Sequence, residues 1–525
     1  MIEGVYVEAL KLPFSKGMAT DYGEHLMPPS YSPFSKNVRV NNSTIVRRKW
    51  YRKIASVNNN TPVKNLISAW WHLYAIVWTT FYEVDVEDWT FTQKITDVWD
   101  NVSAVVFWNF IILCNWEDDG RVFDVAEDTA VPMTDMYSGA KPRFWESYWY
   151  STFLVWGGAN KNILYKSMEW GWQIVESDDP WDERDPKNVY NYTWDGSVRY
   201  SFRSNITWIV ANRENLFVFT ENSIEVMGDA QAPWGYMTLI AQPIAWQNVP
   251  ANPRMIVKAD DLIFFRTRDN MMKSIWYVQW ISELVIWEVS HRSDLSMKQF
   301  CEGLDEDQSD SFGYYNRKDK TVHWHLRQKW EPFPNVVLVY DLWNDTFYID
   351  TNKFFKCQVN HGVKYYTWDA SVQTVYEDNV WDLDNGNPIQ WERRTALFTM
   401  WSPDYRKEFR QVNVYWEKDE DVEISVYVLV DGKEVFQWAI EKHGLPISWL
   451  ASKPLATKPI WFEFEKSERK TFEYLISRGS LRYRGKNIQV IFRWETTWDF
   501  CLSWLEIWYK NLYDSNVSDK AKKRK

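Results

Sequence analysis

Two histidines, His323 and His325, come closest to a metal-binding pattern in this sequence. One residue separates them, so on a β-strand both rings would point to the same face, which is the minimum for a pair of metal ligands. The other five histidines lie far from them in the sequence, and no third ligand is evident nearby. We therefore expect no metal site at this pair.

Two acidic segments, Asp305–Asp310 and Asp382–Pro388, resemble calcium-binding loops. The first lacks glycine at its sixth position, and neither has the closing glutamate at the expected distance, so loop acids are the better interpretation. The sequence also lacks a nucleophile elbow, a zinc-protease helix motif and a phosphate-binding loop. We expect no catalytic, cofactor-binding or metal-binding residues and no enzymatic activity. The many carboxylate pairs leave a glycosidase open as an alternative.

The charge of the chain argues against a general nucleic-acid-binding protein, which usually carries the opposite sign. Its 60 lysines and arginines face 71 aspartates and glutamates, giving a net charge of −11. A local basic cluster, Arg47, Arg48, Lys49, Arg52 and Lys53, is open to two interpretations: a nucleic-acid or partner contact, or a solvated strand face. We favour the solvated face. Residues 513–525 end in lysines and arginine and are expected to form a disordered basic tail.

Cysteine usage and hydropathy limit the cellular setting. The four cysteines are widely spaced with no Cys-x-x-Cys pair, which argues against a disulfide scaffold or a structural zinc site. The first residues do not have the basic start and apolar core of a secretion signal. The longest apolar stretch, near residues 102–114, is shorter than the roughly 20 residues that span a bilayer. We expect no membrane association.

Tryptophan and glycine are present in unusual amounts. The chain has 36 tryptophans and 19 glycines, whereas average usage would give about 37 glycines in a chain of this length. Several tryptophans occupy turn positions that favour glycine, because glycine reaches positive φ without steric cost and a bulky side chain does not. Examples are Trp70, Trp71, Trp78, Trp89, Trp116, Trp194 and Trp343.

We interpret many of these tryptophans as glycines of the native protein. Some bacterial lineages and their phages read UGA as glycine, and a translation that reads UGA as tryptophan would produce this pattern. Trp438 lies inside an apolar run and is expected to be a genuine tryptophan. A genuinely tryptophan-rich carbohydrate-binding protein is the alternative, but it does not explain the shortage of glycine. If the interpretation is right, Trp70, Trp71 and Trp78 should be more exposed, or more unusual in backbone, than Leu73, Ile76 and Phe81.

The elements that position these residues are almost all predicted strands. Residues 1–60 read as an extended N-terminal arm with one short strand near Ile45–Val46. From 62 to 390, hairpins of β-branched and aromatic residues recur about every 35–55 residues, which predicts a β-propeller of six or seven blades. A long β-solenoid is the rival. From 393 to 512, longer alternating strands with an Asp431-Gly432 corner predict an antiparallel β-sandwich. The fold class is therefore all-β.

With tryptophan read as glycine, three segments look familiar. Residues 28–54 resemble the opening of phage virion proteins that precede a propeller, with Asn37-Val38 starting a strand and Trp50 as the glycine of an Arg-x-Gly-Tyr turn. Residues 216–227 resemble one blade of packaged-DNA-stabilisation proteins, which form the tail hub or nozzle below the portal in short-tailed phages. Residues 481–510 resemble the closing sandwich strands of those proteins.

This resemblance implies a virion protein of the head-to-tail connector or tail hub. Several copies would form a homo-oligomeric ring that contacts the portal or adaptor and other tail proteins, and double-stranded DNA would pass through it transiently. The ring would retain packaged DNA and conduct it during ejection, and its interfaces would be head-to-tail and closed. Localisation would be the virion tail or head-tail junction, after assembly in the host cytoplasm, with no cofactors. The alternative is a carbohydrate-binding or glycan-hydrolysing propeller.

Overall fold

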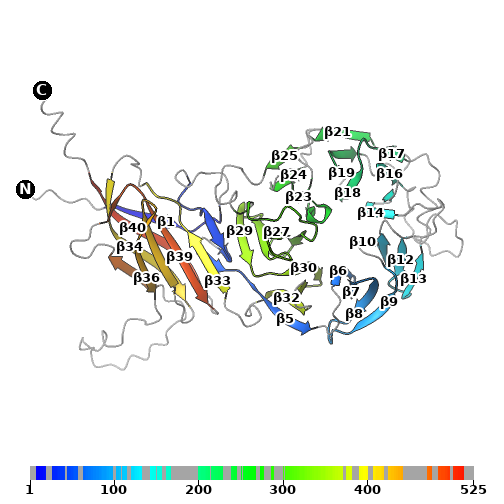
Figure 1. The fold of residues 1–525 in the computed structure, drawn as a ribbon, viewed down its shortest axis with the longest axis horizontal. Coiled ribbons are helices and arrows are strands. Elements are labelled where there is room, and N and C mark those ends of the chain that lie inside the picture. The colour runs from blue at the N-terminus through cyan, green and yellow to red at the C-terminus, as the bar shows by residue number, and fades with distance from the viewer. Residues whose placement is uncertain are drawn as a thin grey trace, which may run out of the picture.

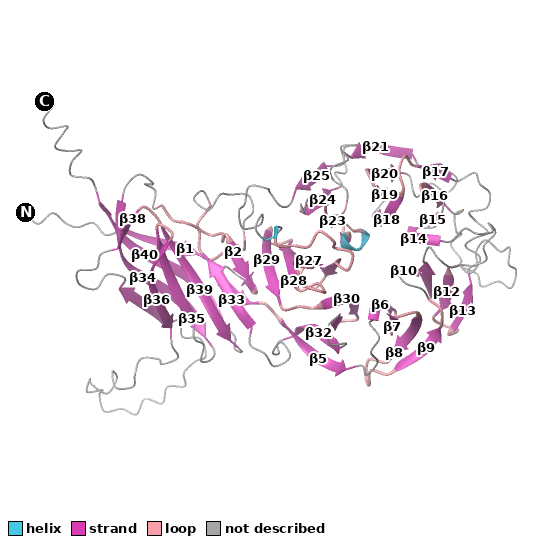
Figure 2. Cartoon of the chain, in the orientation of Figure 1, coloured by secondary structure: helices cyan, strands magenta, loops and turns pink. Residues whose placement is uncertain are grey.

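The computed structural model places strands along most of the residues that it describes (Figures 1 and 2). The described residues are 8–18, 27–41, 44–56, 63–98, 102–107, 109–114, 120–132, 142–148, 151–156, 161–166, 199–212, 215–228, 238–244, 250, 252–267, 272–276, 285–288, 300, 302–369, 374–380, 389–399, 406–418, 424–440, 470–475, 483–496 and 500–512. The predicted tail, 513–525, and the acidic segment Asp382–Pro388 lie outside them.

Seven four-stranded antiparallel units stand in a ring in the described part of the chain (Figure 1). We call them blades 1 to 7. They are β6 (Val63–Ala69), β7 (His72–Val77), β8 (Thr80–Val84) and β9 (Phe91–Ile95); β10 (Ser103–Phe107), β11 (Phe110–Cys114), β12 (Arg121–Asp124) and β13 (Thr129–Pro132); β14 (Pro142–Tyr148), β15 (Ser151–Trp156), β16 (Ile163–Lys166) and β17 (Arg199–Ser201); β18 (Ile206–Asn212), β19 (Asn215–Thr220), β20 (Ile224–Gly228) and β21 (Thr238–Ile244); β22 (Val257–Ala259), β23 (Leu262–Arg266), β24 (Met272–Trp276) and β25 (Val285–Glu288); β26 (Phe312–Asn316), β27 (Thr321–Leu326), β28 (Val336–Asp341) and β29 (Thr346–Thr351); and β30 (Phe355–His361), β31 (Lys364–Asp369), β32 (Thr374–Val380) and β5 (Trp50–Ser56).

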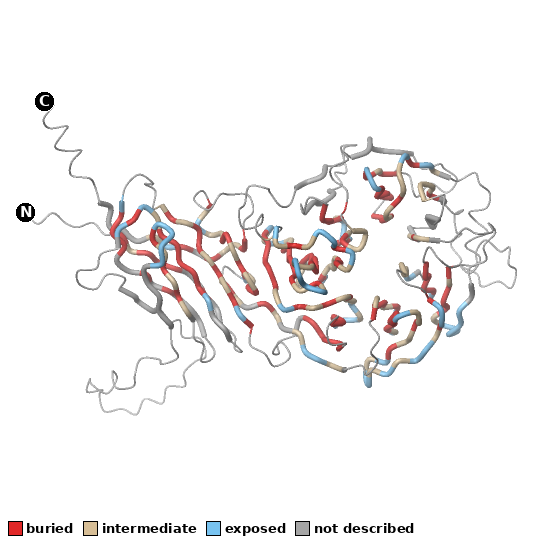
Figure 3. The backbone as a smooth tube through the Cα atoms, viewed as in Figure 1, coloured by how far each residue is buried: buried red, intermediate tan, exposed pale blue. Residues whose placement is uncertain are grey.

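This arrangement is a seven-bladed β-propeller, and it confirms the predicted all-β class and propeller. The first strand of each blade lies towards the centre of the ring and the last lies at the periphery (Figure 1). The middle strands are buried: every residue of β11 and of β19 is buried, because both faces of each blade pack against neighbours (Figure 3). Apolar clusters fill the spaces between blades, such as the one that joins blade 1 to blade 2 through Tyr74, Phe81 and Phe123.

The ring is closed by the N-terminal part of the chain. Blade 7 takes three strands from residues 355–380 and its peripheral strand, β5, from residues 50–56. Thr374 and Val375 of β32 pair with Ser56 and Ala55. Blade 7 therefore cannot be completed until the two ends of the propeller sequence meet.

The remaining strands form a second domain of two sheets, which we call the two-sheet domain. One sheet holds β3 (Val38–Asn41), β4 (Thr44–Arg47), β40 (Phe500–Leu512), β34 (Arg406–Lys418) and β37 (Lys470–Leu475), with β1 (Glu8–Pro13) and β38 (Tyr483–Gly485) attached. The other holds β2 (Phe34–Lys36), β33 (Ile389–Arg394), β39 (Ile488–Thr496), β35 (Ile424–Val430) and β36 (Lys433–Ile440). Through β2, this second sheet continues into β29 of blade 6.

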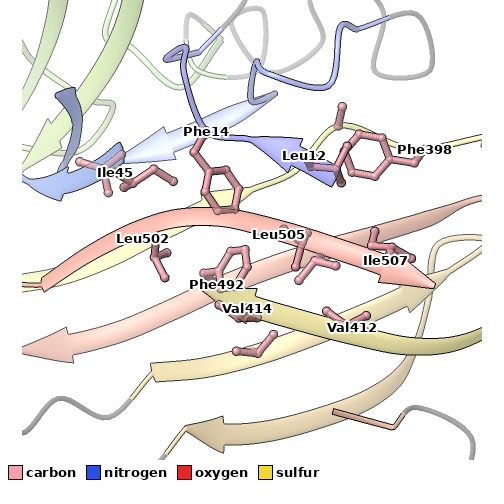
Figure 4. Packing of buried hydrophobic residues seen from close by; sticks show 14 of the residues in the cluster. Leu12, Phe14, Ile45, Phe398, Val412, Val414, Phe492, Leu502, Leu505 and Ile507 are labelled. Atoms are coloured by element: carbon pink, nitrogen blue, oxygen red, sulfur yellow. The ribbon is translucent and has the colours of Figure 1, made fainter. Parts of the chain in front are cut away.

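One apolar core lies between the two sheets. Leu502, Leu505 and Ile507 of β40 face Phe492 of β39 there, and Phe14 packs edge-on against Phe492 with ring centroids 5.8 Å apart (Figure 4). The same core includes Val337, Val339 and Tyr348 of blade 6. The propeller and the two-sheet domain thus share buried apolar surface as well as a sheet.

The N-terminal segment differs from the predicted extended arm. Its described residues contain five strands, β1 to β5, of which β1, β3 and β4 lie in one sheet, β2 lies in the other and β5 lies in blade 7. Its short strands carry weak local signals, and they are stable because distant strands supply their partners. The predicted hairpin corner at Asp431-Gly432 is confirmed, since both residues have positive φ, 49° and 74°.

Candidate functional site

The histidine pair lies in the interior, between blades 6 and 7. His323 and His325 point to the same face of β27, as predicted, but their exposed fractions are 6% and 0%. The His325 ring stacks on Phe312 at a centroid distance of 4.3 Å, and its Nε2 lies 3.2 Å from Oε1 of Gln358. Within the described residues, no group of three potential ligands is arranged to hold a metal ion.

Burial sets the protonation of both rings. It lowers the pKa of His323 to about 4, with a further contribution from the charges of Lys353 and Arg39. It lowers the pKa of His325 to about 3, with a further contribution from His323 and Lys353. Both rings are therefore neutral near pH 7, and proton transfer at that pH is not available to them.

The acidic segment Asp305–Asp310 surrounds an arginine. The Arg327 guanidinium lies within 2.9 Å of Asp307 and 3.5 Å of Asp305, and 4.0 Å from Asp310. Backbone and side-chain hydrogen bonds from Ser309, together with Arg327, lower the pKa of Asp307. Arg327 thus supplies the positive charge that these three carboxylates face.

The basic cluster at residues 47–53 divides between the interior and the surface. Arg48 is buried and its Nε donates to Oδ1 of Asn37 at 3.1 Å. Lys49 pairs with Asp319 of blade 6 at 2.9 Å, and Arg52 pairs with Glu377 of blade 7 at 2.8 Å. Most of the described side chains of this cluster therefore join the N-terminal strands to the propeller.

Arg48 belongs to a largely buried network that we call the junction: Asn37, Arg39, Arg48, Asp350, Lys353 and Asp378. Both terminal guanidinium nitrogens of Arg39, Nη1 and Nη2, donate to the Asp350 carboxylate, at 2.9 and 2.7 Å. Lys353 donates to Asp378 at 3.0 Å and lies 3.9 Å from Asp350. The junction thus connects β3, blade 6 and blade 7 at the base of the two-sheet domain.

The attraction between Arg39 and Asp350 keeps both groups in their charged forms. Burial raises the pKa of Asp350, but the charges of Arg39 and Lys353 dominate and hold it well below its usual range. Burial also lowers the pKa of Arg39, and the Asp350 carboxylate more than compensates. Removing one partner from such a pair leaves an uncompensated buried charge.

The turn tryptophans lie where they were predicted to lie. Trp70, Trp71 and Trp78 are 60%, 87% and 56% exposed, whereas Leu73 and Ile76 are each 1% exposed. Trp70 and Trp78 have φ of 56° and 55°, and so does Trp89, at 57°. The comparison made from the sequence is confirmed.

Two details differ from the sequence interpretation. Trp343 is 78% exposed, but Asp345 takes the positive φ of its turn, at 51°. Trp330, which sequence reasoning did not single out, has φ of 71° and is 98% exposed. Its signal was its place between two strand-like runs and next to loop residues. Trp116 and Trp194 lie outside the described residues.

The described thiols offer no activated nucleophile. Cys114 and Cys357 are buried, and burial raises the pKa of each to about 12. A thiol needs a lowered pKa to react as the thiolate near neutral pH. Among the described helices, none is long and apolar enough to cross a membrane.

Comparison with solved structures finds distant similarities at low sequence identity. The chain resembles the Cps50 (Swd1) β-propeller domain of Myceliophteria thermophila at 8% identity and a TM-score of 0.40, over 63% of this chain and 99% of that one. It resembles the N-terminal domain of Nup159 at 9% identity and a TM-score of 0.39, over 66% and 99% of the two chains. It resembles the computationally designed Ika8 protein at 8% identity and a TM-score of 0.37, over 63% and 100%. No protein-family model matches the sequence, and neither does the sequence of any curated protein.

Proposed function

We propose that this protein is a structural component of a phage virion, at the head-to-tail connector or the tail hub. Several copies would form a closed ring around the DNA path, in contact with the portal or adaptor and other tail proteins. The protein would act mechanically, without a cofactor and without enzymatic activity, and would reside in the virion after assembly in the host cytoplasm.

The observation that carries this proposal is the way the two domains are joined. The N-terminal strands pass through both sheets of the two-sheet domain and then close the propeller. The second sheet continues into blade 6, and the junction ties the same elements together by buried ion pairs. Most domain pairs move relative to each other unless their interface is large and apolar. A body braced in this way suits a part that carries load from packaged DNA.

The test is where the protein lies and how it assembles. Mass photometry of the purified chain should give a closed oligomer, and negative-stain images should show rings. Mass spectrometry of purified particles should find the protein with portal and capsid proteins. A monomer that hydrolyses a glycan and is absent from particles would overturn the proposal.

The carbohydrate-binding alternative rests on one observation, the exposed aromatic rings of Trp70, Trp71 and Trp78 on blade 1. Exposed rings can stack on sugars if they belong to the native protein. The identity of these residues therefore decides between the two functions, and it can be tested separately.

We propose in addition that many tryptophans of this sequence are glycines in the native protein, encoded by UGA. The support is conformational: Trp70, Trp78, Trp89 and Trp330 have φ between 55° and 71°, where a bulky side chain is strained and glycine is not. Trp324, Trp368 and Trp391 are fully buried instead. We expect UGA at the first group and UGG at the second. Peptide mass spectrometry of the native protein checks the assignment, and tryptophan at the first group would overturn it.

A further inference from the structure

One position at or just before the start of the innermost strands is repeatedly basic. In each blade the innermost strand and the next strand form a hairpin. In blades 1, 3, 5 and 7 a lysine or arginine lies six residues before the first residue of the turn of that hairpin. The four residues are Lys64, Arg143, Arg254 and Lys356, and the turns are fixed by the pairs Ala69↔His72, Tyr148↔Ser151, Ala259↔Leu262 and His361↔Lys364. The corresponding residues of blades 2 and 4 are Val102 and Thr207.

The backbone at this position is specialised. The strand register shifts across Lys64, across Arg143 and across Lys356, so each of the three is the extra residue of a β-bulge. Arg254 lies instead in the short 3-10 helix η4 (Pro253–Met255) that precedes β22. Bulges redirect a side chain and are common at the rims of barrels and next to functional sites. Thr207 of blade 4 has the same bulge without a charge, so the bulge does not itself require a basic residue.

These four residues lie at one mouth of the propeller. The innermost strands of all blades start on the same side of the ring, since each blade repeats the same up-and-down order of strands. Equal distance from the hairpin turn then places the four residues at similar depth. We call this set the basic rim.

The charges of the basic rim lie close enough to influence each other. Burial and the charge of Lys356 lower the pKa of Lys64, which places these two side chains near each other across the boundary of blades 7 and 1. Arg254 Nη2 donates to the carbonyl of Lys356 at 3.2 Å. Two carboxylates offset part of the positive charge of the basic rim. Asp310 lies 3.9 Å from Lys356 Nζ, and the charge of Glu221 partly opposes the lowering of the Arg143 pKa by burial.

The rim contrasts with the rest of this acidic chain. The innermost strands β6, β10, β14, β18, β22, β26 and β30 contain one carboxylate, Glu146, although the whole chain has a net charge of −11. Cations gathered at one mouth of a ring attract anions there even when the net charge is negative.

We propose that the basic rim binds the phosphate backbone of DNA. The cations come from four of the seven blades around the mouth, two of them adjacent, so an extended polyanion reaches more of them than a single small anion does. Lysine supplies point charges and arginine a planar fork of donors, and both pair with phosphate oxygens. The choice of DNA among polyanions rests on the proposed function, and the rim itself rests on geometry.

The test is the salt dependence of binding. The full-length protein is titrated with a fluorescent 20-base-pair duplex between 50 and 200 mM salt, and log K is plotted against log salt. The slope of this plot is negative, and each lost phosphate contact reduces its magnitude by about 0.9. We expect the Lys64→Gln, Lys356→Gln double variant to reduce the magnitude of the slope by up to about 2 and to weaken binding at 50 mM salt.

The matched control is Lys364→Gln. Lys364 begins β31, at the other end of the hairpin that contains Lys356, and it is exposed. Lys364→Gln removes one charge of the two that the double variant removes, so a change in slope of half that of the double variant would overturn the proposal, as would an unchanged slope in the double variant. Thermal unfolding of each variant checks that the fold is intact. Inorganic phosphate at constant ionic strength should not displace DNA; specific displacement would indicate a small-anion site and overturn the assignment to DNA.

Failure of this inference is distinguishable from failure of the proposed function. A ring-forming virion protein whose DNA binding ignores Lys64 and Lys356 would contradict only the rim. A protein absent from particles whose DNA binding depends on those lysines would contradict only the virion role.

Discussion

The junction and the basic rim both hold charged side chains partly or fully out of water, but in opposite settings. At the junction each cation lies against a carboxylate: Arg39 against Asp350, and Lys353 against Asp378. The pKa of Arg39 is raised and that of Asp350 is lowered, so the folded state favours the charged forms. At the rim, burial lowers the pKa of Lys64, Arg143 and Arg254. Folding thus favours the charged forms of Arg39 and Asp350 and disfavours those of Lys64, Arg143 and Arg254.

This difference indicates different roles. Charges that the fold stabilises align blades 6 and 7 with the two-sheet domain. The rim instead gathers cations from different blades at one mouth, where an external anion is attracted.

The largest expected effect is at the junction. Asp350→Asn removes the carboxylate that holds Arg39 and leaves buried cations without their counter-charge, so we expect a loss of about 3–5 kcal/mol in the free energy of unfolding. Denaturant titration followed by circular dichroism measures it. The control is Asp260→Asn, which breaks the surface pair with Lys320 and should cost no more than about 1 kcal/mol. Equal losses in the two variants would remove the distinction.

Acid should weaken the same region. The pKa values of His323 and His325 are about 4 and about 3 in the folded state, below the 6.5 of a free histidine. Between pH 6.5 and these lower values the unfolded chain binds protons that the folded chain does not. The contribution of the two histidines to the free energy of unfolding is therefore fully present above pH 6.5 and is lost as the pH falls towards their folded-state pKa values. From pH 7 to pH 5 we expect a loss on the order of 2 kcal/mol per ring. The His323→Gln, His325→Gln variant should lose much of this dependence; the same pH profile in both proteins would contradict it.

The turn tryptophans should behave unlike the buried ones. Trp330 has φ of 71° and is 98% exposed, so Trp330→Gly should raise the free energy of unfolding by up to about 1 kcal/mol through relief of backbone strain. Trp71, which is 87% exposed, has no such φ, and Trp71→Gly is the matched control with little expected gain. Trp324→Gly should cost at least about 3–5 kcal/mol, because this ring is fully buried and donates to the Met255 carbonyl. Destabilisation by Trp330→Gly would argue against native glycine there.

The smallest expected effect is at the rim. Lys64→Gln should leave the free energy of unfolding unchanged within about 0.5 kcal/mol or raise it slightly, because it removes a charge that burial and Lys356 disfavour. Lys353→Gln at the junction should lower it, because Asp378 would lose its partner. Thermal unfolding of both variants in one buffer makes the comparison. A larger loss from Lys64→Gln than from Lys353→Gln would reverse the assigned roles.

Local sequence patterns were enough to predict the hairpins and the propeller. The two strand-like runs around Trp343 are β28 and β29, and the turn expected between them is there. Hydrophobic alternation and turn residues act within a few positions of the chain. They therefore favour the same hairpin whichever distant strands pack against its apolar face. The blade number, predicted as six or seven, is seven in the described part of the chain.

The N-terminal segment shows that such local patterns do not predict pairing between distant strands. Trp50–Ser56 pairs with Thr374–Val380, more than 300 residues later, and Lys36 pairs with Ile349. Nothing in a seven-residue strand specifies a partner at that distance. The predicted propeller boundary at 390 also shifts, because Ile389–Arg394 pairs with β39 and belongs to the two-sheet domain.

The sequence by itself determined that this chain is all-β, that its hairpins recur as blades, and that several of its tryptophans occupy turn positions suited to glycine. These properties follow from backbone preferences, which each residue expresses locally. Only the tertiary structure decided which charges are buried in pairs and which gather at a mouth. Arg39 and Asp350 are 311 residues apart, and the residues of the basic rim come from four blades. Electrostatic roles depend on distance and burial, and both are set only when the ring closes.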